Sequence, residues 1–147
     1  MTGFDIRLER IVDATPDAAF QHWVDAEARQ RWYAPDDSWV VAEAETDLRV
    51  GGAWRVRFGP TPDEMYVESG VFEEVEPPHR VVYTTHYEFP DGRPPFQTHV
   101  TVTFEPRGDR TLLTLLDTGY PSEEQRAANE SGWPGFLDAY ERTLGYS

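Results

Sequence analysis

The sequence contains four histidines, which are candidates for acid–base chemistry. His86 and His99 lie on consecutive predicted strands at equal distances from the turn between them, which predicts that they are cross-strand neighbours. His22 lies beside a tryptophan on a predicted helix, and His79 follows two prolines in a turn. His86 and His99 could form an acid–base pair inside a cavity, or be exposed residues without a chemical role. A metal site would need a third ligand, which the sequence does not supply, so no metal is expected.

Asp117 is the carboxylate most suited to an interior position. It shares a strand face with Leu113 and Leu115, so its side chain is expected to point inward. A buried carboxyl group has a raised pKa and can act as a general acid or base. The alternative is an aspartate that accepts hydrogen bonds at a strand end before Gly119. No Ser-His-Asp spacing, paired-carboxylate signature or nucleotide-binding loop is present.

The aromatic residues of this chain fit a ligand-binding cavity better than a reaction centre. They recur at positions that share one face of a predicted strand or helix, and aromatic walls with a few polar groups suit an amphipathic or aromatic small molecule. The alternative is a fully packed core without a cavity. The cavity candidates are Trp54, Phe58, Tyr83, His86, Tyr87, His99, Asp117, Trp133, Phe136 and Tyr140.

The elements that must position these residues follow from periodicity and from turn residues. Alternating apolar residues predict an opening strand over Phe4 to Val12, and Thr15 and Asp25 are expected to cap two short helices, the second of them ending near Trp32. Six further strands with period-two patterns are separated by turns too short for a crossover helix, so neighbours must be antiparallel. They are expected at 39–44, 53–58, 65–75, 80–89, 98–105 and 111–118.

A long amphipathic helix is predicted from Ser122 to Leu144, with Ser122 as its N-cap and Gln125 completing a capping box. Pro134 predicts a kink or a break. The half before Pro134 carries only small or polar side chains, whereas apolar residues fill one face of the half that follows. Beneath the first half, either the sheet approaches very closely or a hollow remains.

Composition excludes several classes of function. The 147 residues are expected to form one domain, 1–147, and carry a net charge of −14 with scattered basic residues, which argues against binding nucleic acid. The absence of cysteine excludes disulfides and thiolate chemistry. No targeting segment or membrane span is evident, so the cytoplasm is the expected location. No cofactor is expected.

These elements predict an α+β fold, in which a curved antiparallel sheet of about seven strands wraps around the long C-terminal helix. The two short helices are expected between the first and second strands.

Gly51 and Gly52 precede a strand and predict a tight turn or bulge. Asp47 and Arg49 are expected to stabilise this turn by a charge-assisted hydrogen bond.

Several segments along the chain form a recognisable series. They are Asp47, Arg49, Gly51, Gly52 and Trp54, then 70–78 leading into 80–84, then 111–115, and finally Gly132 and Trp133. In this order they resemble the SRPBCC or START-like superfamily, and within it the group similar to the activator of heat-shock-protein-90 ATPase. The resemblance spans the chain and implies a helix-grip fold, like that of the birch-pollen allergen, with a hydrophobic cavity between sheet and helix. No catalytic motif is shared within the group.

Three functions are compatible with this sequence. The first is non-catalytic binding of a hydrophobic or aromatic small molecule, including a lipid, in a cavity of at least ~300 Å³. The second is a cyclase, dehydratase or hydrolase that uses Asp117, His86 or His99, of which two would have to meet inside the cavity. The third is a chaperone-regulating or other protein-interaction module, or a homodimer formed on the outer sheet face.

Overall fold

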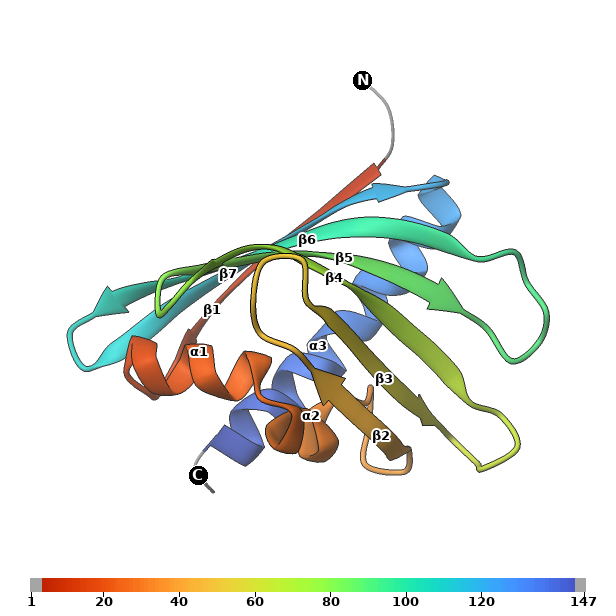
Figure 1. Cartoon of the computed structure of the whole chain (residues 1–147), viewed down its shortest axis with the longest axis horizontal. Helices are drawn as coiled ribbons and strands as arrows, with labels where there is room; N and C mark the ends of the chain where they lie inside the picture. The colour runs from red at the N-terminus through yellow and green to blue at the C-terminus, as the bar shows by residue number, and fades with distance from the viewer. Residues whose placement is uncertain (1–3, 145–147) are drawn as a thin grey trace.

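The computed structural model describes residues 4–144 and shows a curved seven-stranded sheet with three helices on its concave side (Figure 1). This is the predicted helix-grip α+β fold. In chain order the elements are β1 (Phe4–Val12), α1 (Pro16–Val24), α2 (Ala26–Trp32), β2 (Val40–Thr46), β3 (Ala53–Gly59), β4 (Tyr66–Glu76), β5 (Arg80–Glu88), β6 (Phe96–Arg107), β7 (Arg110–Tyr120) and α3 (Glu123–Leu144).

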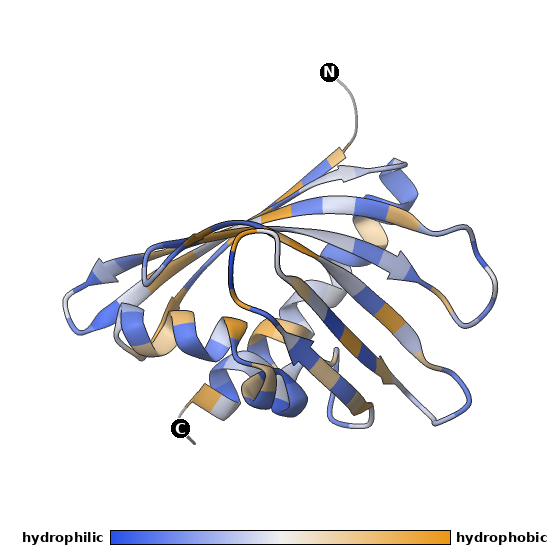
Figure 2. Ribbon diagram, in the orientation of Figure 1, coloured by the Kyte–Doolittle hydropathy of each residue, from blue (hydrophilic) through white to orange (hydrophobic). Residues whose placement is uncertain are grey.

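All neighbouring strands are antiparallel, in the order β1-β7-β6-β5-β4-β3-β2. Apolar and polar residues alternate along the strands, as the colouring of β3 shows (Figure 2). The apolar side of this alternation faces the helices, because an antiparallel sheet with one wet face must bury the other. The first strand and both short helices have the predicted bounds, and β6 extends further than predicted at both ends.

The predicted helix caps and the predicted glycine turn are confirmed. Thr15 Oγ1 accepts a hydrogen bond from the Ala18 N–H at 3.4 Å, and Asp25 Oδ2 accepts one from the Ala28 N–H at 3.0 Å. Gly51 has a φ of +84°, which favours glycine. The adjacent Arg49 Nε donates to Asp47 Oδ2 at 2.8 Å, as expected for a turn stabilised by this pair.

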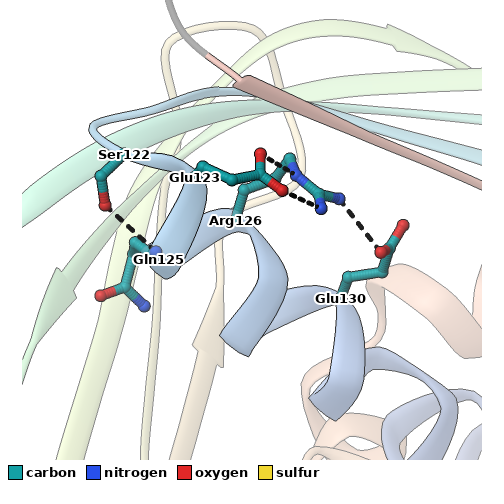
Figure 3. A network of polar contacts seen from close by, with 5 residues as sticks. All are labelled: Ser122, Glu123, Gln125, Arg126 and Glu130. Atoms are coloured by element: carbon teal, nitrogen blue, oxygen red, sulfur yellow. Dashed lines mark hydrogen bonds and ion pairs between the residues drawn. The ribbon is translucent and has the colours of Figure 1, made fainter.

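The N-terminus of α3 is capped by Ser122, whose Oγ accepts the Gln125 N–H at 3.1 Å (Figure 3). The side chain of Gln125 donates to Asn129 Oδ1 at 2.6 Å, one turn further along. On the opposite side of this turn, Arg126 bridges Glu123 and Glu130, with N–O distances of 2.8 Å and 3.0 Å (Figure 3). These contacts and the acidic first turn make a well-stabilised helix start.

Pro134 does not interrupt α3, which continues through it as one helix to Leu144. The predicted alternative of a break is therefore wrong. Pro134 is exposed, so its ring lies on the solvent side, where water can satisfy the carbonyl that loses its partner.

The second half of α3 is fixed by contacts with α1, α2 and β1. The Tyr140 hydroxyl donates to the Ala19 carbonyl at 2.6 Å, and His22 Nε2 lies 2.8 Å from Thr143 Oγ1. Arg10 on β1 bridges Asp138 and Glu141 at 2.7 Å and 2.9 Å. These contacts hold the helix at a fixed position over the sheet.

Close backbone approach at Gly135 adds a further constraint. A Cβ at this position would lie 2.0 Å from the Pro35 carbonyl oxygen, so only glycine lets the segment between α2 and β2 pack directly on α3. Gly132, one turn earlier, has nothing within 4 Å of its virtual Cβ. The two glycines therefore have opposite structural requirements.

We predict that Gly135→Ala lowers the free energy of unfolding by about 1–3 kcal/mol, because its methyl group clashes with the Pro35 backbone. The matched variant Gly132→Ala should raise it by about 0.5–1 kcal/mol, since alanine is the better helix former and meets no neighbour. Urea unfolding followed by circular dichroism measures both. Equal effects of the two variants would contradict the close approach at Gly135.

Candidate functional site

A pocket of about 250 Å³ lies between the first half of α3 and the concave face of the sheet. Its α3 side consists of the side chains that follow one another along the inner face of the helix. These are Gln125, Ala128, Asn129, Gly132, Trp133 and Phe136. The small and polar residues before Pro134 therefore line this pocket.

The opposite side of the pocket is mostly aromatic. The sheet contributes Phe58 from β3, Tyr66 and Glu68 from β4, and Tyr87 from β5, and the turn after β5 adds Phe89 and Arg93. The segment between α2 and β2 closes one end with Tyr33, Pro35 and Trp39. Several rings meet edge to face, among them Tyr33 with Phe58 at 5.5 Å and Tyr33 with Phe136 at 5.2 Å between centroids. Such packing gives the wall a defined shape.

Glu68 is the one carboxyl group in the pocket lining. The Tyr33 hydroxyl donates a hydrogen bond to Glu68 Oε1 at 2.6 Å. Burial among aromatic rings raises the pKa of Glu68 to about 7, although the Tyr33 hydrogen bond and the Arg29 charge oppose the rise. Near neutral pH this group can therefore either donate or accept a proton, or bind a ligand in either charge state.

Arg29 is a completely buried cation next to this wall. Its Nε donates to the Trp23 carbonyl at 2.7 Å, but Nη1 and Nη2 have no hydrogen-bond partner among residues 4–144. The guanidinium carbon lies 5.4 Å, 5.0 Å and 5.6 Å from the ring centroids of Tyr33, Trp54 and Tyr83. The faces of these rings stabilise the charge that its hydrogen bonds leave uncompensated.

Asp117 is fully buried on the interior face that it shares with Leu113 and Leu115, as the sequence indicated. The Tyr120 hydroxyl donates a hydrogen bond to Asp117 Oδ2, and the Trp133 Nε1–H donates another to the same oxygen at 3.3 Å. Burial raises the pKa of Asp117 to about 6, against these hydrogen bonds. Asp117 does not line the pocket, but its partner Trp133 does.

His86 and His99 lie on the outer face of the sheet and do not contribute to the pocket. The interior face of β5 carries Tyr83 and Tyr87, so the alternate residue His86 points outward. The two histidines are not directly opposite each other, because His86 pairs with Gln97 and His99 pairs with Thr84, so they are only diagonal neighbours on adjacent strands. The exposed His99 Nε2 lies 3.6 Å from a Glu73 carboxylate oxygen.

The cavity candidates named from the sequence therefore fall into three groups. Phe58, Tyr87, Trp133 and Phe136 line the pocket, whereas Trp54, Tyr83, Asp117 and Tyr140 are buried outside its lining. The third group is the histidine pair on the outer face. Sequence reasoning missed Glu68, Tyr33, Trp39, Tyr66 and the buried Arg29. The sequence does contain a signal for Glu68, because in a regular strand Glu68 lies on the same face as Tyr66 and the apolar Phe72.

No group of three His, Asp or Glu residues within 4–144 could hold a metal ion. None of the helices in the same range is long and apolar enough to cross a membrane.

Comparison with known proteins agrees with this architecture. Residues 13–145 match the family described as Activator of Hsp90 ATPase homolog 1-like protein. The chain belongs to this family. No curated protein sequence matches the chain.

Solved structures show the same family fold. The AHSA1 protein from Silicibacter pomeroyi is 27% identical, with a TM-score of 0.83, and the match covers 97% of this chain and 99% of that one. A protein from Rhizobium loti is 26% identical, with a TM-score of 0.79 and coverage of 95% and 96%. A protein from Chromobacterium violaceum, 23% identical, has a TM-score of 0.81 over 95% and 96% of the two chains.

We predict that Glu68→Gln stabilises the protein at pH 8 by on the order of 1–3 kcal/mol. The folded-state pKa of Glu68, about 7, lies above the ordinary pKa of 4.5, so ionisation of Glu68 costs folding free energy as the pH rises through this range. Glutamine stays neutral and can still accept the Tyr33 hydrogen bond.

The gain should shrink toward zero below pH 4.5, where the glutamate is protonated in both the folded and the unfolded state. Urea unfolding of both proteins between pH 4 and 8 measures it. A gain that does not vary with pH would contradict the raised pKa.

Proposed function

We propose that this chain binds a small hydrophobic or aromatic molecule in the pocket under the first half of α3, without transforming it. The observation that carries the proposal is the aromatic hollow of about 250 Å³ at the place where the α3 sequence lacks bulk. Its volume is below the ~300 Å³ typical of the smallest drug-sized sites, which favours a ligand with one ring system.

Polar groups at opposite sides of the pocket suit an amphipathic ligand. Glu68 lies in its floor, the amides of Gln125 and Asn129 lie in its α3 side, and Arg93 lies at the turn after β5. Apolar burial would supply most of the affinity, and one or two of these groups would orient the ligand.

The enzymatic alternative has no comparable support. It required two of Asp117, His86 and His99 to meet inside the cavity, and the structure places the histidines on the outer face. Asp117 accepts hydrogen bonds from Tyr120 and Trp133 and does not line the pocket.

A protein-interaction module is also less well supported. Its large exposed hydrophobic residues are spread over β1, β2, β4, β7 and the loop between β2 and β3, and the fold contains a hollow. The family name refers to an activator of a chaperone ATPase, but no surface feature of residues 4–144 adds to that link.

We predict that Gly132→Leu abolishes ligand binding without destabilising the fold. Gly132 lines the pocket and a Cβ there would meet no neighbouring atom within 4 Å, so we expect leucine to extend into the space that the ligand would occupy. Gly132→Ala is the matched control, since it adds the same backbone preference and little volume.

The experiment screens neutral, cationic and anionic one-ring aromatic fragments by ¹H–¹⁵N chemical shifts. At least one fragment should shift the amides of Glu68, Asn129 and residue 132 in the wild type and in Gly132→Ala, and its affinity should fall at least about tenfold in Gly132→Leu. Thermal unfolding checks the fold of each variant. If no fragment moves these amides, or if Gly132→Leu binds equally well, the proposal fails.

A further inference from the structure

The ionisable groups around the pocket are unbalanced toward negative charge. Two carboxyl groups, Glu68 and Asp117, lie near the buried guanidinium of Arg29, and Glu68 interacts electrostatically with both Asp117 and Arg29. Only Glu68 faces the pocket. When both carboxyl groups are ionised, the interior carries one negative charge for which residues 4–144 supply no buried cation.

Arg93, the other charged residue of the lining, does not supply this missing charge. Its Nε lies 2.8 Å from Asp91 Oδ2, and its guanidinium carbon lies 4.2 Å from the Phe89 ring centroid. Arg93 is thus paired at the exposed turn after β5.

Aromatic rings line the pocket around Glu68, and one of them, Tyr33, already stabilises a cation in this fold. Tyr33 both lines the pocket and lies 5.4 Å from the Arg29 guanidinium on the other side of the wall. Ring faces attract ammonium groups, most strongly where water is excluded. A carboxylate beneath aromatic walls is therefore suited to an organic cation.

We propose that the pocket selects small organic cations, such as aromatic amines and quaternary ammonium compounds, with Glu68 as the counter-ion and the aromatic walls around the ammonium group. The inference rests on the proposed function and names its ligand class. The net charge of −14 also favours binding of cations, because it raises their concentration near the protein.

Binding of such a cation is coupled to ionisation of Glu68. The groups that face this carboxyl are Arg29 and Tyr33 from the α2 side, Tyr83 and Tyr87 from β5, and Asp117 from β7. A permanent cation stabilises the ionised form, so its affinity rises as the pH passes through about 7, the pKa of Glu68.

The test compares phenyltrimethylammonium with tert-butylbenzene, which has the same shape and no charge. Dissociation constants are measured from amide chemical shifts at pH 6 and pH 8. At pH 8 the cation should bind the wild type at least about tenfold more tightly than its neutral isostere, and this preference should be smaller at pH 6. Glu68→Gln should remove the preference, and Gly132→Leu should bind neither probe.

The outcomes separate this inference from the proposed function. Equal binding of the two probes to the wild type, or tighter binding of benzoate than of the cation, overturns the cation preference and leaves a hydrophobic binding pocket. A preference that persists in Glu68→Gln overturns the role of Glu68 as counter-ion. If no probe binds the wild type, both the inference and the proposed function fail for ligands of this size.

Discussion

The pocket depends on how the second half of α3 is held. Tyr140 bonds to the Ala19 carbonyl, Gly135 packs on the Pro35 backbone, and Arg10 binds two acidic residues of the helix. Because α3 is one continuous helix, these contacts also set the position of its first half over the sheet. The small side chains there cannot fill the space beneath them. The hollow therefore follows from a difference in side-chain size between two halves of the same helix.

Electrostatics inside the fold are organised by the buried Arg29. A guanidinium without full hydrogen bonding is costly in an apolar interior, and the three rings around it reduce that cost. Its charge also lowers the pKa of Glu68, opposing the rise that burial causes. Tyr33 joins the two regions, since its ring contacts Arg29 and its hydroxyl binds Glu68. The polar character of the pocket is thus connected to packing in the core behind it.

Local signals predicted most of the fold, because alternation, caps and turn residues depend on neighbours in sequence. Thr15, Asp25 and Ser122 cap their helices as expected. The site was harder to predict, since it depends on register and on polar residues that face inward. The β5–β6 pairing places Gln97, two residues before His99, opposite His86. Charged residues such as Arg29 and Glu68 are usually exposed, so their burial is visible only when the packing partners are known.

The position of β1 at one edge of the sheet has a consequence for how the chain folds. β1 pairs only with β7, so that Phe4 lies opposite Tyr120 and the first strand finds its neighbour after six others have been synthesised. Contacts this distant in sequence slow folding, because a long loop must close before they form. During synthesis the part of the concave apolar face that α3 covers also stays open until this helix has emerged, after all seven strands. A nascent chain of this protein therefore exposes an incomplete sheet that is open to aggregation until α3 packs against it.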